Sequence, residues 1–160
     1  NIYFPGAQVR SNTSINIESG GRVMLWEKHC FGRPSIKERF CTGNLYSKIQ
    51  LRSEGKLLFS ETQRVNAEEL QRTSGMRKYP VMGSFIIYGI DLEKSVLRDL
   101  QKIKPGNGLA GISQPQPLLL ICRYLGDSTS DVDAYFIGLW ERLRPLLLER
   151  EACYPRIWKT

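Results

Sequence analysis

The sequence has little of what most catalytic and metal sites need. Its 160 residues contain one histidine and four cysteines, and no two cysteines form a Cys-x-x-Cys pair. That spacing is typical neither of a zinc site nor of a dense disulfide scaffold. The sequence also lacks a Gly-x-Ser-x-Gly motif and a glycine-rich phosphate loop, so nothing in it indicates a serine hydrolase or a nucleotide-binding enzyme.

Targeting and membrane signals are also missing. No stretch of 18 apolar residues and no signal peptide is evident, so we expect no membrane partner. Scattered single cysteines in a domain with its own core favour a reducing compartment, and we expect the protein in the cytoplasm. The chain opens on Asn1 without an initiator methionine, which we interpret as a chain whose natural beginning is missing.

The composition is that of one globular domain with a basic surface. Hydrophobic residues make up 41% of the chain, which is enough for one substantial core. The net charge is +7, so the surface favours acidic partners such as a nucleic acid, an anionic lipid or an acidic protein. The basic residues form no run of five or six, which weakens the case for a nucleic-acid-binding arm.

Strand signals fill the first two thirds of the chain. Alternation over residues 44–52 places Leu45, Ser47, Ile49 and Leu51 on one face of a half-buried strand. A turn at residues 53–55 and a returning segment at 56–65 predict an antiparallel hairpin. Further strands are expected at the ranges 22–30, 81–90 and 117–124.

Two segments predict helices, and the longer lies near the C-terminus. The first covers residues 91–103, after a capping aspartate and before Pro105, and a loop at 106–116 follows it. The second covers residues 131–149, where Pro145 should kink or end it. The predicted fold is therefore mainly β, with antiparallel sheets and two helices, and the apolar stripe of the second helix is expected to face the core.

The candidate chemical groups gather around the only histidine. His29 adjoins Cys30, but neighbouring side chains on a strand point to opposite faces, so they should not form a catalytic dyad. Glu27 shares the face of His29, and Glu38 could fold back across the turn at residues 32–34. One imidazole and two carboxylates could hold a divalent cation such as nickel weakly and transiently. The alternative is an ordinary charged strand surface.

A cluster of basic and aromatic residues leaves a second function open. Arg33, Lys37 and Arg39 lie beside two phenylalanines, Phe31 and Phe40. Basic and aromatic side chains on a β surface can bind single-stranded nucleic acid. Glutamates interrupt the cluster, and no RNA-recognition signature is present. A basic β-rich nucleic-acid-binding domain is therefore the alternative to a binding scaffold for other proteins.

Two blocks of sequence carry a resemblance to a known family. The first runs from Trp26 to Pro34 and continues at Glu38-Arg39-Phe40. The second runs from Arg123 to Asp127 and closes on Pro155-Arg156-Ile157-Trp158. Both resemble the urease accessory protein UreD (UreH) family, and the match covers nearly the whole chain. The resemblance implies one UreD-like domain at residues 1–160, with stacked or helix-like β-sheets and the N-terminal part of the family fold missing.

The resemblance implies a scaffold without enzymatic activity. UreD proteins bind the accessory protein UreF, which recruits UreG, and they contact the urease apoprotein while nickel passes to its active site. Nickel in transit would contact Glu27, His29 and Glu38, with no tightly bound cofactor and no nucleic acid. Lys37 departs from the family, which usually has a small residue there, often glycine. The resemblance carries family-motif or partner-binding roles onto Glu27, Gly32, Arg33, Glu38, Arg123, Arg144, Arg156 and Trp158.

Overall fold

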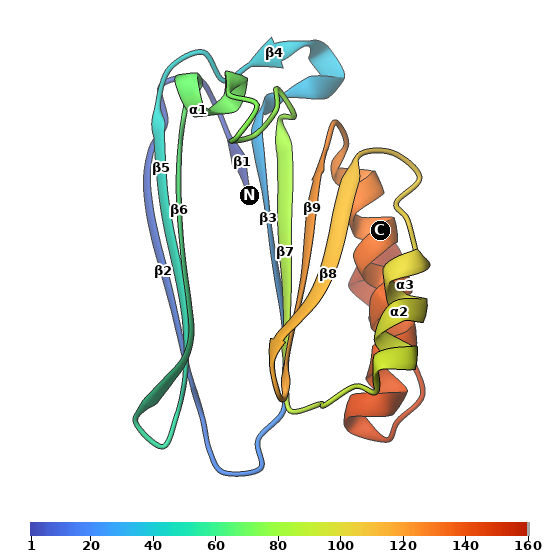
Figure 1. The fold of residues 1–160 in the computed structure, drawn as a ribbon. Coiled ribbons are helices and arrows are strands. Elements are labelled where there is room, and N and C mark those ends of the chain that lie inside the picture. The colour runs from blue at the N-terminus through green and yellow to red at the C-terminus, as the bar shows by residue number, and fades with distance from the viewer. Residues whose placement is uncertain (160) are drawn as a thin grey trace.

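The molecule has three layers, a small sheet, a larger sheet and a layer of helices (Figure 1). Side chains alternate along each strand, so the larger sheet has two faces, and each is covered by another layer. The structure is a computed structural model and describes residues 1–159. The small sheet has the order β2-β5-β6, with β2 (Gln8–Ile17), β5 (Asn44–Ser53) and β6 (Lys56–Asn66). The larger sheet has the order β1-β3-β7-β9-β8, with β4 paired to β3, and comprises β1 (Ile2–Tyr3), β3 (Val23–Arg33), β4 (Glu38–Arg39), β7 (Val81–Tyr88), β8 (Leu109–Gln116) and β9 (Leu119–Gly126).

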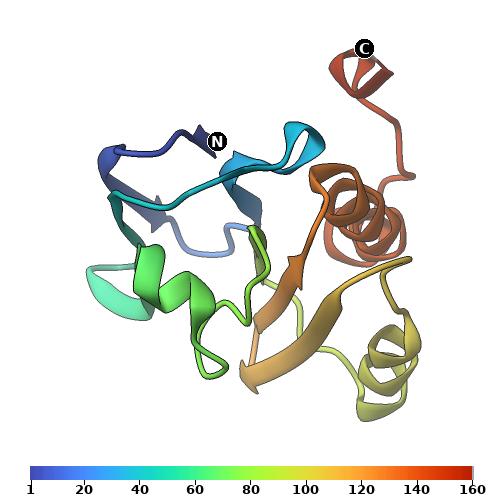
Figure 2. The ribbon, with the colours of Figure 1, turned by 90° about the horizontal axis from the view of Figure 1, so that it is seen from above.

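Helices cover the outer face and one end of this sandwich. Two of them, α2 (Lys94–Lys102) and α3 (Thr129–Leu148), lie on the side of the larger sheet away from the small one, as the view from above also shows (Figure 2). The short α1 (Ala67–Gln71) lies at the end of the sandwich, and η1 (Pro34–Ile36) and η2 (Arg156–Lys159) are 3-10 turns. The prediction of a mainly β fold with its longest helix near the C-terminus is confirmed.

The predicted hairpin is present. Strands β5 and β6 pair antiparallel, and the two residues between them, Glu54 and Gly55, both have positive φ (50° and 75°). A two-residue turn with two positive φ angles matches the twist of the flanking strands, and glycine supplies one of them without strain. Pairing is not antiparallel throughout, because β2 runs parallel to β5 and β1 runs parallel to β3.

The prediction of a loop over residues 106–116 is wrong for most of its length. Residues 109–116 form β8, which pairs antiparallel with β9. Pro115 falls in the irregularity of the β8–β9 pairing between Ser113 and Gln116, on the last strand of the sheet, and proline is tolerated at such positions. The glycine, proline and glutamine content that suggests a loop is also compatible with an edge strand.

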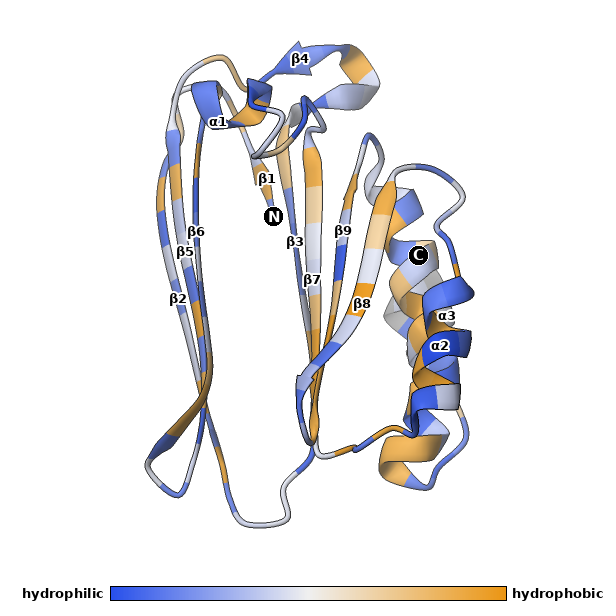
Figure 3. Ribbon diagram, in the orientation of Figure 1, coloured by the Kyte–Doolittle hydropathy of each residue, from blue (hydrophilic) through white to orange (hydrophobic). Residues whose placement is uncertain are grey.

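The largest apolar core lies between the larger sheet and the helices. Its sheet side comes from alternate residues of β3, β7 and β9, and its helix side from the apolar stripe of α3, visible by colour in Figure 3. The expectation that this stripe faces the core is confirmed, since Phe136 and Leu143 are fully buried and Trp140 is 5% exposed. Lys28 of β3 also forms an ion pair with Asp133 of α3, so one polar contact fixes the helix against the sheet.

The long helix ends close to its proline. α3 continues through Pro145 and ends at Leu148, and the next residue, Glu149, adopts a left-handed conformation (φ 54°). Proline cannot donate a backbone hydrogen bond, and the helix does not continue for a full turn beyond it. Within residues 1–159 no helix is both long enough and apolar enough to cross a membrane.

The turn that carries Lys37 explains why a small residue suits this position. Lys37 follows η1 with φ 60° and ψ 18°, the left-handed region that glycine adopts without strain. A side chain in this region costs about 1–2 kcal/mol. Nearby, Gly32 has φ 83°, and a Cβ atom there would lie 2.4 Å from the carbonyl oxygen of Glu38.

We predict that Lys37→Gly raises the free energy of unfolding by about 0.5–1 kcal/mol. The gain is the relief of backbone strain, reduced by the larger entropy of glycine in the unfolded chain. Chemical denaturation measures it. Lys37→Ala is the matched control, because it removes the same charge but keeps the strain, and it should give no gain. A gain with alanine equal to that with glycine would attribute the effect to charge and contradict the backbone explanation.

Candidate functional site

A layer of polar side chains crosses the interior between the two sheets. Along β3, β7 and β9 the residues facing the small sheet are mostly apolar, and they form one cluster toward each end of the sandwich. Between these clusters the same strand faces carry Glu27, Ser84 and Arg123, which stand in one row because they pair across the sheet. We call this set the polar layer, and its members are Thr13, Glu27, His29, Ser47, Glu61, Gln63, Ser84 and Arg123.

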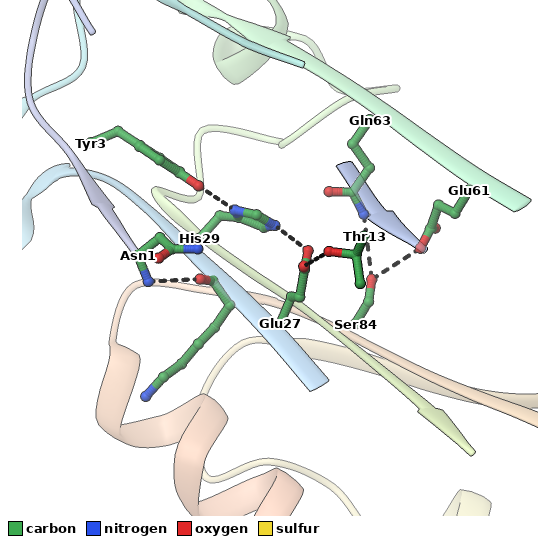
Figure 4. A network of polar contacts seen from close by, with 9 residues as sticks. Asn1, Tyr3, Thr13, Glu27, His29, Glu61, Gln63 and Ser84 are labelled. Atoms are coloured by element: carbon green, nitrogen blue, oxygen red, sulfur yellow. Dashed lines mark hydrogen bonds and ion pairs between the residues drawn. The ribbon is translucent and has the colours of Figure 1, made fainter. Parts of the chain in front are cut away.

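The polar layer joins the two sheets by side-chain contacts (Figure 4). Thr13 of β2 donates to Glu27 Oε1 of β3 at 3.0 Å. Arg123 of β9 donates to Glu61 Oε1 of β6 through Nη2 at 2.7 Å and through Nε at 3.0 Å. Ser84 Oγ of β7 lies 3.4 Å from Glu61 Oε2. These contacts fix how the sheets stack, because each is made by strands of different sheets.

His29 lies at the centre of a hydrogen-bonded chain that ends on Glu27. Its Nδ1 lies 2.8 Å from the phenol oxygen of Tyr3, and its Nε2 lies 3.4 Å from Glu27 Oε2. Burial raises the pKa of the Tyr3 phenol, which therefore keeps its proton. With a neutral imidazole, Tyr3 donates to Nδ1, and Nε2–H points toward the carboxylate. The histidine side chain is 3% exposed and that of Glu27 is 16% exposed.

The contact with His29 lowers the pKa of Glu27, and the hydrogen bond from Thr13 acts in the same direction. Burial opposes both, because it penalises the charged carboxylate, but the net pKa is below its ordinary value. Glu27 is therefore an anion held inside the sandwich. Its Oε2 is buried and makes no hydrogen bond in the described part of the chain, and its contact with His29 Nε2 is long, at 3.4 Å. Gln63 Oε1 is buried and without a partner among the described residues as well.

A cavity of about 540 Å³ opens beside the layer, between the edge of the small sheet and β8 and β9. Gln63, Ser84 and Arg123 line it together with the methionines Met76 and Met82. The layer is therefore close to solvent on the side of Arg123, whose side chain is 53% exposed and covers that of Glu61. The polar layer as a whole offers carboxylate, amide and hydroxyl oxygens and one imidazole, of which Gln63 and Ser84 line the cavity.

The structure brings together two members of the predicted metal group and separates the third. Glu27 and His29 share a face of β3, as expected, but Glu38 lies on β4 and pairs with Arg33 at the end of β3. Six residues of strand place Arg33 about 20 Å from Glu27. No group of three histidine, cysteine, aspartate or glutamate side chains that could hold a metal occurs within residues 1–159.

The Arg33–Glu38 pair is a separate surface feature. Its contacts are bidentate, Nε to Oε2 at 2.9 Å and Nη2 to Oε1 at 2.8 Å. The guanidinium also lies over the ring of Phe4, 5.1 Å from its centroid. The hydrogen bond from Arg33 lowers the pKa of Glu38. This pair closes the turn at Gly32, which is the structural role that the bidentate geometry suits.

Three further candidates lie near the C-terminus, on the helical side of the larger sheet. Trp158 packs against Trp26 and Trp140, with ring centroids 5.3 and 5.0 Å apart. Arg144 lies over the Trp140 ring and donates to the carbonyl oxygen of Glu151 at 3.1 Å. Arg156 is exposed. The structure thus gives Trp158 and Arg144 a packing role in holding the C-terminal segment.

The two other interpretations of this region lose support. Phe31 and Phe40 are 1% and 4% exposed, so they cannot stack on bases beside Arg33 and Arg39. His29 and Cys30 point to opposite faces of β3, as strand geometry predicts, and Cys30 belongs to the core on the helical side. The nucleic-acid interpretation of this cluster and a Cys30–His29 dyad both lack the required geometry.

Sequence reasoning missed four members of the layer, namely Thr13, Glu61, Gln63 and Ser84. A signal for Ser84 was present, because this polar residue stands at the parity of buried apolar neighbours. Met82 and Ile86, two residues before and after Ser84 on the same face of β7, are both buried. The pattern does not show that the polar residues of separate strands meet at one level.

Comparison with known proteins identifies the family. A sequence model described as the UreD urease accessory protein matches residues 1–159. The chain belongs to the UreD family. Urease accessory protein UreD of Nitrosococcus oceani is 35% identical over 161 residues, which cover 99% of this chain and 54% of that protein. The UreD proteins of Pseudomonas aeruginosa and Aliivibrio fischeri are 34% and 32% identical, with 57% and 59% of their lengths covered.

The chain therefore spans little more than half the length of the UreD proteins it matches. The relatives that it matches are named urease accessory proteins. The polar layer lies within the matched UreD region, and so do both of the sequence blocks that carry the resemblance.

We predict that Glu27→Gln lowers the free energy of unfolding by about 1–3 kcal/mol at pH 7, because it removes a charged acceptor from His29 and Thr13. The pKa of Glu27 is lowered by folding, so its contribution is present above pH 4.5, the ordinary pKa of the group, and is lost as the pH falls through the lowered value. The difference between variant and parent should shrink on acidification. Urea denaturation at a series of pH values measures it.

Glu18→Gln is the control for this series, because Glu18 is exposed and lies outside the polar layer. It should change stability little at any pH. A Glu27→Gln variant as stable as its parent at pH 7 would mean that the layer does not hold Glu27 as a favoured anion.

Proposed function

We propose that this chain is part of a urease maturation scaffold that binds UreF, and UreG through it, and the urease apoprotein. In this proposal nickel passes through the polar layer on its way to urease, and urease maturation takes place in the cytoplasm. Membership of the UreD family supports the accessory role. The polar layer carries the transport part of the proposal, since it is a row of buried polar side chains between two apolar clusters, with a cavity beside it.

The donor set of the layer suits an ion that has to leave again. Nickel accepts nitrogen and oxygen ligands, and thiolates would bind it far more tightly. Cys30 and Cys122 lie on the opposite face of the larger sheet, in the core under the helices. Burial raises the pKa of Cys122 to about 12, so its thiol stays protonated. The layer therefore offers Glu27, His29 and the oxygens of neutral side chains, with Glu61 paired to Arg123 and no competing thiolate.

The two acceptor atoms without hydrogen bonds give the path its points of contact. Glu27 Oε2 and Gln63 Oε1 are both buried, and neither has a donor of good geometry among the described residues. A buried acceptor without a partner costs free energy that a passing cation could recover. The cavity lined by Gln63, Ser84 and Arg123 is the proposed entrance or exit, because it reaches one side of the polar layer.

We predict that Glu27→Gln and His29→Gln leave the complex with the other accessory proteins and the apoprotein intact, but reduce the nickel content of matured urease several-fold. Both side chains lie inside the sandwich, so neither can contribute a surface to a partner. The measurements are co-purification of the complex, thermal melting of each variant, and nickel per urease active site by elemental analysis.

Glu38→Gln is the matched control, because it removes a carboxylate from the same sequence block at the protein surface. It should leave the nickel content at the level of the parent. If every variant that lowers nickel also loses the complex or melts below the assay temperature, a conduit role for the polar layer is wrong. The same holds if neither interior variant changes the nickel content.

A further inference from the structure

The outer face of the small sheet carries a concentration of positive charge. Strand register identifies the side chains that point away from the larger sheet. None of them is acidic, and four are cations. The outward-facing residues are Gln8, Arg10, Asn12, Ser14 and Asn16 of β2, Asn44, Tyr46, Lys48, Gln50 and Arg52 of β5, and Leu57, Ser60, Thr62, Arg64 and Asn66 of β6.

The cations on this face have no acidic partner of their own. Elsewhere, lysines and arginines such as Lys28, Arg33 and Arg123 pair with acidic side chains of the same chain. No ion pair within 4.0 Å involves Arg10, Lys48, Arg52 or Arg64 in the part of the chain that the structure describes. Their charge is available to a partner.

Two of the arginines are arranged around an aromatic ring. Arg10, Tyr46 and Arg64 stand in one row across the three strands. The guanidinium carbons lie 5.0 and 5.5 Å from the centroid of the Tyr46 ring. The two arginines reach the ring from β2 and β6, the strands on either side of β5. Cation–π contact of this kind limits the freedom of the arginines before any ligand arrives.

A row of amides continues this arrangement toward the end of the sheet. Gln8, Asn44 and Asn66 form the neighbouring row, with Asn44 Nδ2 donating to Gln8 Oε1 at 3.0 Å. These residues line a groove of about 580 Å³ together with Arg10, Tyr46 and Arg64. One glutamate, Glu69, also lines the groove, but its carboxylate is paired with Arg72. Guanidinium and amide donors together are the groups that bind carboxylates.

Three other occupants fit this face poorly. A second copy of the chain would oppose four cations to four cations, which repel each other. A single-stranded nucleic acid would need open aromatic rings on which to stack its bases, but the ring of Tyr46 is already in contact with two guanidinium groups. A lipid surface would need several large apolar side chains to insert, and Leu57 is the only such side chain among these fifteen residues besides Tyr46.

We propose that the outer face of the small sheet docks an acidic segment of a partner protein, with the guanidinium groups of Arg10 and Arg64 binding its carboxylates. The proposal rests on the proposed scaffold function and adds the chemistry of one partner. Tyrosine and arginine are the residues that most often dominate binding at protein interfaces. Complementary charge across such a surface also speeds association and excludes partners of the wrong sign.

The test is direct binding of the full chain to a fluorescent ten-residue glutamate peptide, which matches the length of β5. Parallel titrations use single-stranded oligothymidylate and vesicles of phosphatidylserine and phosphatidylcholine. We expect the peptide to bind and the double variant Arg10→Gln/Arg64→Gln to raise its Kd about tenfold. If thermal melting shows that the first double variant does not fold, Lys48→Gln/Arg52→Gln, a second pair of cations on the same face, replaces it.

The matched control is Arg98→Gln/Arg142→Gln, which removes two exposed arginines from α2 and α3 on the far side of the molecule. It changes the net charge equally and should leave the Kd unchanged. The proposal would be overturned if the control variant weakened peptide binding as much as the variant of the outer face. It would also be overturned if the peptide did not bind at all. Tighter binding of oligothymidylate or vesicles, lost in the same variant, would overturn it in favour of that ligand. The assay contains neither nickel nor urease, so its failure is separate from failure of the conduit proposal.

Discussion

The carboxylate of Glu27 lies between two β-sheets, and an anion in that place has to be met by donors from its surroundings. Its own sheet supplies His29, which in turn contacts Tyr3, and the opposite sheet supplies Thr13. A slip of either sheet by one residue would turn these side chains outward, since strand side chains alternate. The charge at Glu27 therefore specifies the stacking of the sandwich more narrowly than the apolar clusters on either side, which tolerate small shifts.

The stability of the fold does not require polar side chains at this position between the two sheets. Buried ion pairs replaced by apolar side chains of similar volume commonly leave a protein equally stable or more so. The neighbouring levels of the same strands are filled in that way, with Ile86 and Ile121 toward one end of the sandwich. The layer also leaves Glu27 Oε2 and Gln63 Oε1 without good partners, which is a further cost. Passage of a polar cargo accounts for both features, whereas structural specificity alone accounts only for the paired atoms.

Much of this arrangement could be predicted from local sequence, and the rest depends on tertiary placement. The alternation around Ser47 and the opposed faces of His29 and Cys30 follow from the pleat of single strands, and the structure has both. Strand β8 was missed because an edge strand accepts the proline and glycine content that is typical of loops. The meeting of Glu61 with Arg123 depends on how two sheets stack, and no single strand contains that information.

The small sheet contributes its inner face to the polar layer, and its outer face carries the unpaired cations. The pleat of the strands keeps the two sets of side chains apart. Along β6, Glu61 and Gln63 point into the polar layer, while Thr62 and Arg64 point to the outer face. Along β2, Thr13 faces inward and Arg10 outward. Because neighbouring residues face opposite sides, a substitution at one surface leaves the side chains of the other in place. The proposed ion path inside and the proposed docking surface outside can therefore vary independently, although only the thickness of one sheet separates them.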